Sequence, residues 1–282
     1  MKVQVKINPV YDAIAEWLRA IPDVFATSGE TIFRGRNEIK RVLTPDGSVL
    51  AVKRFGHLPL FRRLIYSTVE RSKARRAFDN GNRFIALGFN TPEPVACIEI
   101  YRRGILADAY FVSLHSSFTP LFIPLVKAER FDTSLADQVA ALMADLHSKG
   151  AVHGDPNLNN ILYQRQPDGS VSMSLIDTNR SKFGRMSRRR CLKNLMRVTH
   201  RRDLMSRIAG RYATLRGLDP VRTIDCIFSM LARFERNRAL RHRLKAIILR
   251  KVLEYPETVR PITPPMDVKY NPSADGTFCA AP

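Results

Sequence analysis

Three polar residues in the middle of the chain have the types and the spacing that phosphoryl transfer needs. Asp155 and Asn160 lie five residues apart in a polar loop, and Asp177 ends the next apolar strand, seventeen residues beyond Asn160. Phosphoryl transfer requires an aspartate that orients and deprotonates the acceptor hydroxyl, and oxygen ligands that hold Mg²⁺ on the phosphates. Because His-x-Asp-x-x-x-x-Asn followed by a strand ending in Asp has the order found in kinases, the pattern predicts a kinase-like phosphotransferase.

The segments around these residues favour this interpretation over simple turn chemistry, for which loops also use Asp and Gly. A helix is predicted over residues 134–148, with apolar residues in phase on one face. Strands are predicted at 161–163 and 171–176, and the Pro167-Asp168-Gly169 sequence between them is typical of a hairpin turn. The motif therefore stands in the helix, loop and hairpin context that its chemistry requires.

The N-terminal part of the chain is predicted to supply the phosphate-binding groups. A short helix is expected over residues 10–19, ended by Pro22, and a three-stranded meander follows over 31–55. Lys53 lies on the third strand in an Ala-Val-Lys sequence, similar to the lysine with which kinases hold the α- and β-phosphates. Gly35 lies in the turn between the first two strands of the meander. It is a candidate for the phosphate-cradling loop, although the Gly-x-Gly-x-x-Gly pattern is absent.

A helix that starts between Ile65 and Lys73 and ends near Leu87 is expected to present an acid to Lys53. Its apolar face continues backward to Glu70, whereas Asp79 falls among basic residues on the polar face. Glu70 is therefore predicted as the partner of Lys53, with a surface position for Glu70 as the alternative.

The order of the predicted elements indicates an α+β fold with two lobes. A second hairpin at 95–114 completes a five-stranded antiparallel sheet that carries one helix, and a mainly helical lobe follows. The predicted divisions are an N-terminal extension at 1–28, a nucleotide-binding lobe at 29–116, a catalytic lobe at 117–254 and an extended proline-rich tail at 255–282.

Composition limits the class of protein. At 282 residues the chain can bury a substantial core, and it contains neither an apolar run long enough to span a membrane nor a secretory signal. Four scattered cysteines without metal-ligand spacing indicate reduced thiols in a cytosolic protein.

The net charge of +20 is concentrated in the C-terminal part of the chain. Residues 180–253 contain 22 Lys/Arg against four Asp/Glu, whereas the remainder is nearly balanced. Since such one-sided charge destabilises a fold by self-repulsion, an anionic partner is expected: a phosphorylated glycolipid, an anionic membrane surface or nucleic acid.

Several sequence segments resemble the lipopolysaccharide kinase family, which includes Kdo kinases and core heptose kinases. These segments are residues 72–78, 87–94 with Thr-Pro-Glu-Pro, 152–162 with the His-Gly-Asp loop, and 175–180 with Asp-Thr-Asn-Arg. The resemblance is to the Bacteroides-type branch and covers roughly residues 25–250. It implies a protein-kinase-like fold, ATP as donor, and a sugar hydroxyl of the lipopolysaccharide inner core as acceptor.

The resemblance also implies a role for each motif residue. Lys53 would bind the ATP phosphates, Asp155 would be the catalytic base, and Asn160 with Asp177 would hold Mg²⁺. His153 would support the loop as a structural residue.

Departures from the protein-kinase pattern favour a small-molecule or glycolipid acceptor. Asn157 stands where protein kinases carry lysine, Thr178-Asn179 replaces Phe-Gly, and neither Ala-Pro-Glu nor room for a long activation loop is present.

Three functions follow from these features. The first is a glycolipid kinase in the cytoplasm, peripheral on the inner membrane, with basic helices 180–253 facing the anionic substrate and headgroups. The second, a kinase for an aminoglycoside-type or choline-type substrate, fits poorly with the basic C-terminal lobe. The third is an inactive scaffold for membrane or nucleic acid; nucleic acid is not expected, because few aromatic residues accompany the basic ones. Protein partners, oligomeric state and the exact acceptor hydroxyl do not follow from the sequence.

Overall fold

A computed structural model describes residues 1–56, 65, 66 and 70–253, with side chains up to residue 244. Its described residues form two compact units, 1–123 with 152–183, and 124–151 with 184–253. The first unit thus includes the His-Gly-Asp loop. The predicted tail at 255–282 lies outside the described residues, and the predicted lobe boundaries stay predictions.

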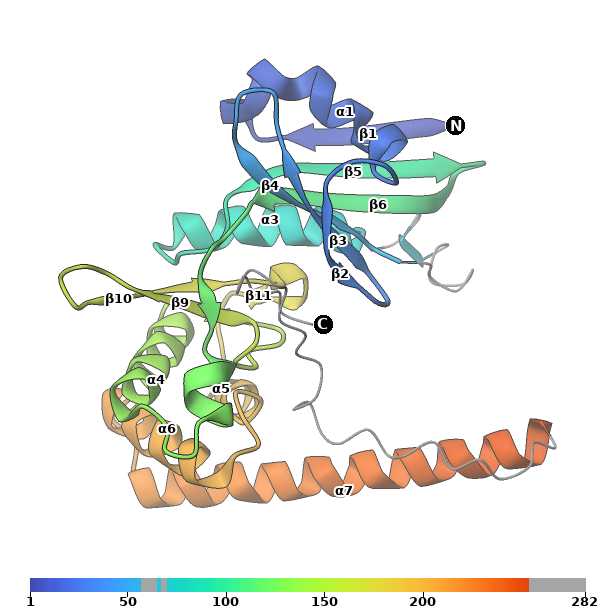
Figure 1. Ribbon diagram of the computed structural model, residues 1–282. Coiled ribbons are helices and arrows are strands. Elements are labelled where there is room, and N and C mark those ends of the chain that lie inside the picture. The colour runs from blue at the N-terminus through green and yellow to red at the C-terminus, as the bar shows by residue number, and fades with distance from the viewer. Residues whose placement is uncertain (57–64, 67–69, 254–282) are drawn as a thin grey trace. The chain divides into compact units, whose positions relative to one another are not determined.

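The first unit is built on a six-stranded antiparallel sheet (Figure 1). Its strands, in spatial order, are β1 (Lys2–Ile7), β5 (Pro94–Arg102), β6 (Ile105–Leu114), β4 (Val49–Arg54), β3 (Glu38–Leu43) and β2 (Glu30–Arg34). The predicted count of five was wrong because the sequence analysis treated residues 1–28 as an extension. Residues Lys2 to Ile7 instead pair with the whole run from Ala96 to Tyr101, which gives β5 a partner on both sides.

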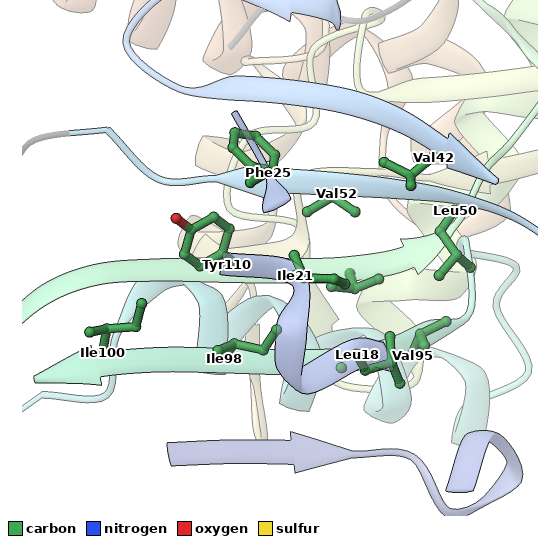
Figure 2. Packing of buried hydrophobic residues seen from close by; sticks show 12 residues of the cluster. Leu18, Ile21, Phe25, Val42, Leu50, Val52, Val95, Ile98, Ile100 and Tyr110 are labelled. Atoms are coloured by element: carbon green, nitrogen blue, oxygen red, sulfur yellow. The ribbon is translucent and has the colours of Figure 1, made fainter. Parts of the chain in front are cut away.

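Helices cover the two faces of this sheet, with α1 (Ala15–Val24) on one side and α3 (Lys73–Ala86) on the other (Figure 1). Strand β5 is buried on both faces from Pro94 to Ile100, as expected of a strand covered on both sides. Its Ile98 packs in the cluster with Leu18 and Ile21 of α1, whereas the neighbouring Cys97 packs with Phe78 of α3. Figure 2 shows the α1 cluster.

Helix α1 departs from the prediction at Pro22. A short 3-10 segment, η1 (Pro9–Ile14), precedes it, and the helix continues through Pro22 to Val24. Proline costs one backbone hydrogen bond inside a helix. Burial of Leu18, Ile21 and Phe25 against the sheet outweighs that loss.

A second, three-stranded sheet includes the two strands that follow the His-Gly-Asp loop. Its strands are β10 (Val171–Leu175), β9 (Ile161–Arg165) and β7 (Thr119–Pro120), and a 3-10 turn, η3 (Thr178–Arg180), follows β10. The predicted hairpin between β9 and β10 is present, with Gly169 in a left-handed conformation at φ 82°. Two short strands, β8 (Ala151–Val152) and β11 (Lys182–Phe183), flank this region.

The second unit is helical. It contains most of a short π-helical turn, η2 (Ile123–Lys127), and the helices α4 (Thr133–Ser148), α5 (Arg188–Leu195), α6 (Arg202–Leu215) and α7 (Pro220–Leu253). Its core is made by α4 and α6, and α7 runs as one helix from Pro220 to Leu253 (Figure 1). The buried His147 of α4 bonds both Tyr212 Oη, at 2.8 Å, and Asn194 Oδ1, at 3.1 Å.

Candidate active site

Lys53 and Asp177 form an ion pair at the centre of the first unit. Lys53 Nζ donates to Asp177 Oδ1 at 2.8 Å, and the two side chains are only 14% and 15% exposed. Alternation along β4 directs Val52 into the α1 cluster and therefore places Lys53 on the opposite face of the sheet. The strand lysine and the strand-ending aspartate that the sequence selected thus meet directly.

Asp177 is held in an unusual backbone conformation. Its φ of 57° is left-handed, which is uncommon for any residue except glycine, although aspartate tolerates it better than most. Asn179 Nδ2 donates to the same carboxylate oxygen at 2.6 Å. Burial disfavours the charged carboxylate, but the neighbouring Lys53 ammonium outweighs it and holds the pKa of Asp177 below its usual range.

His153 supports the His-Gly-Asp loop and is fully buried. Its Nε2 lies 2.8 Å from the carbonyl of Ile176, and its Nδ1 accepts the backbone N–H of Asp155 at 3.2 Å. The ring also stacks on Phe84 of α3. Burial lowers the pKa of His153, so the ring is neutral, donates from Nε2 and accepts at Nδ1. This geometry suits the expected structural role, since His153 connects the backbones on either side of the site.

Asp155 and Asn160 are joined through the loop that they share. Asn160 Nδ2 donates to the Asp155 carbonyl at 3.0 Å, and the Asn160 carbonyl accepts the N–H of Ile176, next to Asp177. The Asp155 carboxylate receives Asn157 Nδ2 at 3.3 Å and Arg180 Nη1 at 3.4 Å. The loop therefore fixes the base candidate and the amide relative to the strand end.

A pocket lies where these elements meet, within the first unit. Lys53, Asn160 and Asp177 line it and lie close together, because Lys53 bonds Asp177 and the Asn160 carbonyl accepts the N–H of the neighbouring Ile176; these three residues are its polar end. Its other walls are largely apolar and come from the strands and the segment after β6; they include Ile32, Ile39, Ala51, Phe111, Leu114, Leu162 and Ile176. An apolar slot with a charged end matches a flat base joined to phosphates.

The donor set at the polar end fits Mg²⁺. This ion takes oxygen ligands and is usually bound by one or two carboxylates together with substrate phosphates. Asp177 offers a buried carboxylate, and Asn160, whose Nδ2 is used by Asp155, offers its amide oxygen. In the part of the chain that the structure describes, no cluster of three His, Cys, Asp or Glu suggests a metal cage made by protein alone.

The sequence model of the lipopolysaccharide kinase (Kdo/WaaP) family matches residues 46–211, more than half of the chain. The chain belongs to this family. It is therefore an ATP-dependent kinase that acts on lipopolysaccharide, a sugar kinase of the core region.

Two solved structures are similar to the chain to different extents. The chain resembles WaaP in complex with acyl carrier protein at a TM-score of 0.58 and 17% identity, over 83% of this chain and 97% of that one. Rio2 kinase from Chaetomium thermophilum, in its ADP/Mg²⁺-phosphoaspartate complex, gives a TM-score of 0.42 and 17% identity over 75% of this chain and 74% of that one. No curated protein sequence matches the chain. The WaaP match confirms the predicted kinase-like fold.

The expected Glu70–Lys53 pair does not form, because each predicted partner is engaged elsewhere. Glu70 is exposed, lies before the helix begins, and pairs with Arg76 at 3.4 Å. Asp79, the alternative acid, pairs with Lys6 of β1 at 2.8 Å and with Arg71 at 2.9 Å. In this structure Lys53 pairs with Asp177, and neither Glu70 nor Asp79 contacts it.

Gly35 lies in the turn between β2 and β3, as predicted. Its N–H donates to the Asn37 carbonyl, and a Cβ at this position would approach the Phe33 ring to 2.8 Å. A side chain at this position would therefore require the Phe33 ring to move. Its assignment to phosphate binding stays a prediction.

Sequence reasoning assigned no role to two residues that anchor the backbone before and after Asp177. Asn80, on the buried side of α3, donates to the carbonyl of Thr178 at 2.8 Å. Thr91 donates to the carbonyl of Leu175 at 2.7 Å and also lines the pocket. Thr91 lies in the Thr-Pro-Glu-Pro segment of the family resemblance, where no role was assigned to it, and the available signal for Asn80 was a polar residue among the apolar positions of the helix.

Proposed function

We propose that this member of the family transfers the γ-phosphoryl group of ATP to a sugar hydroxyl of the lipopolysaccharide inner core, on Kdo or heptose. Mg²⁺ is the accompanying ion. The reaction takes place at the cytoplasmic face of the inner membrane, where the protein is peripherally bound.

One observation carries the proposal: Lys53, Asn160 and Asp177 line one end of a single pocket. The polar end suits phosphates and a metal ion, and the apolar walls suit adenine. Asp155 is not among the lining residues, but Asn160 joins it to the pocket through the 3.0 Å bond to its carbonyl. The base candidate thus stands at the border of the donor site, where an acceptor hydroxyl must approach.

The mechanism follows from the residues. Asp155 accepts the proton of the sugar hydroxyl while the hydroxyl oxygen attacks the γ-phosphorus, and Lys53 holds the phosphates of the donor. Asn160 and Asp177 would hold Mg²⁺, which when bound neutralises charge on the phosphates. His153 stays neutral and maintains the distance between the loop of Asp155 and the strand end of Asp177.

Charge in the second unit supports the membrane part of the proposal. Arg188, Arg189 and Arg190 are exposed at the start of α5. On α7 the buried residues end at Leu231, and the helix continues with exposed basic residues beside the exposed Leu240 and Leu244. Exposed arginines and leucines on one helix are typical of helices that bind an anionic membrane surface.

The deciding experiment measures ³²P transfer from labelled ATP to purified inner-core lipopolysaccharides that end in Kdo or in heptose. Wild type is compared with Asp155→Asn, and Asp108→Asn is the control because Asp108 is also an arginine-paired, partly buried carboxylate of the first unit. We expect Mg²⁺-dependent label that Asp155→Asn abolishes and Asp108→Asn preserves. Acyl carrier protein is added in parallel, so that a missing protein partner is not mistaken for an inactive enzyme.

Two results would overturn the proposal. Labelling of small alcohols or amines without labelling of lipopolysaccharide would assign a different acceptor. Equal labelling by wild type and Asp155→Asn would remove Asp155 from the reaction.

A further inference from the structure

The Asp155 carboxylate has a cation beside it that the mechanism above does not use. Arg180 Nη1 lies 3.4 Å from Asp155 Oδ2, and the Arg180 side chain remains 46% exposed. A guanidinium carries five N–H donors. The structure shows one of these donors at Asp155, and the exposure of the side chain leaves room for a ligand oxygen to reach the guanidinium.

The position of Arg180 is fixed by the backbone. Gly154 packs against Arg180 so closely that a Cβ at this position would overlap the Arg180 backbone. Two bonds to α3 hold η3 in place, from Asn80 Nδ2 to the Thr178 carbonyl at 2.8 Å and from Thr178 Oγ1 to the Ala77 carbonyl at 3.3 Å. The guanidinium is thus positioned beside the base before any substrate binds.

The other charges of the site favour a role for Arg180 on the acceptor side. Asn157, two residues after the base, is uncharged at the position where protein kinases carry lysine. Lys53 is paired with Asp177 at the donor end. Arg180 is therefore a cation in direct contact with Asp155.

We propose that Arg180 is the catalytic cation on the acceptor side, and that it contacts the γ-phosphoryl oxygens during transfer. This inference rests on the proposed function. In the step, the acceptor O–H proton passes to Asp155, the bond between the acceptor oxygen and the γ-phosphorus forms, and the bond from that phosphorus to the β–γ bridging oxygen breaks, releasing ADP. Arg180 stabilises the negative charge that spreads over the transferred group.

The test compares Arg180→Ala and Arg180→Lys with Arg102→Ala, which removes an exposed arginine of the same unit from the end of β5. Two reactions are followed, transfer to inner-core lipopolysaccharide and the slow hydrolysis of ATP by water. Binding of ATP is measured separately by calorimetry, and thermal unfolding checks that each variant is folded.

We expect Arg180→Ala to lower kcat by about 10²–10³-fold in both reactions while the Kd for ATP changes little. Added guanidinium ion should restore part of the lost kcat, Arg180→Lys should be intermediate, and Arg102→Ala should match wild type. A guanidinium that merely balanced the charge of Asp155 in the folded protein would not be rescued in this way.

The failures are distinguishable. A wild-type kcat in Arg180→Ala, or a raised KM for the acceptor with kcat retained, would overturn the assignment of Arg180. If the wild type hydrolyses ATP in a way that depends on Arg180 but transfers no phosphate to lipopolysaccharide, the role of Arg180 is supported and the proposed acceptor is wrong. Absence of both reactions in the wild type would overturn both.

Discussion

Lys53 Nζ and Asp177 Oδ1 lie 2.8 Å apart although the residues are 124 positions apart in sequence. The pair joins β4, which carries the lysine proposed to bind phosphates, to the segment after β10, which carries the carboxylate proposed to hold Mg²⁺. Both groups also line the pocket. Each charge is therefore stabilised by the other in this structure, and bound phosphates and metal would have to replace that stabilisation.

The first prediction concerns the stability of this pair. Lys53→Met should lower the free energy of unfolding by about 3–5 kcal/mol, because removal of one partner leaves a mostly buried charge uncompensated. Asp177→Asn should have a similar effect, whereas the double variant should lose much less than the sum of the two. Urea denaturation of the four proteins measures this coupling. Additive losses would show that the two charges do not depend on each other.

The second prediction concerns pH and His147, which is 3% exposed between Tyr212 and Asn194. Burial lowers the pKa of His147 to about 4, whereas the unfolded chain keeps the ordinary value near 6.5. Between these values the unfolded state binds more protons, so stability must fall as pH decreases from about 6.5 to about 4. The loss from this residue is on the order of 3 kcal/mol.

Denaturation curves at pH 7, 5.5 and 4 check this expectation. His147→Gln should flatten the dependence, and His242→Gln, which alters an exposed histidine of α7, should leave it unchanged. The buried His153 contributes in the same direction and will keep part of the slope. An unchanged slope in His147→Gln would contradict the prediction.

Motif spacing predicted the parts of the site that are local in sequence. Asp155, Asn160 and His153 occupy a short loop whose hydrogen bonds follow from its own residues, and the position of Lys53 follows from the meander. The partner of Lys53 could not be predicted in the same way. That choice depends on where the helix begins, and Ser72 caps it, accepting the N–H of Arg75, so that Glu70 lies outside.

The sixth strand and Asn80 were missed for a related physical reason. Strand β1 is stabilised by pairing with β5, about ninety residues later in the chain, and by the ion pair of Lys6 with Asp79. Such long-range contacts leave little trace in local periodicity, where residues 2–7 show only a short polar–apolar alternation. Asn80 likewise has its partner 98 residues away, at Thr178.

The third prediction is that Asn80 positions the loop that carries Asp177 and Arg180. Asn80→Ala should remove the donor from a buried carbonyl, cost about 1–3 kcal/mol of stability and lower kcat, because η3 loses an anchor. Asn82→Ala is the matched control on the same helix, since Asn82 Nδ2 bonds the carbonyl of Phe78 within α3. Equal kcat values for the two variants would contradict a positioning role for Asn80.

The fourth prediction addresses the membrane. Replacement of Arg188, Arg189 and Arg190 by Gln removes three exposed charges from the start of α5. Each basic residue near an anionic surface contributes about 1 kcal/mol, so the affinity for vesicles containing anionic lipid should fall by about two orders of magnitude at low salt. Cosedimentation with such vesicles measures the loss, and uncharged vesicles should bind neither protein.

The matched control for this experiment replaces Lys2, Arg19 and Arg102 by Gln. These residues are exposed in the first unit, so the variant loses the same formal charge away from α5. If charge in the second unit directs binding, only the α5 variant loses affinity, and salt weakens the wild type toward it because screening acts on exposed charges. Equal losses in the two variants would instead indicate attraction by net charge alone, and the basic helices would have no specific role at the membrane.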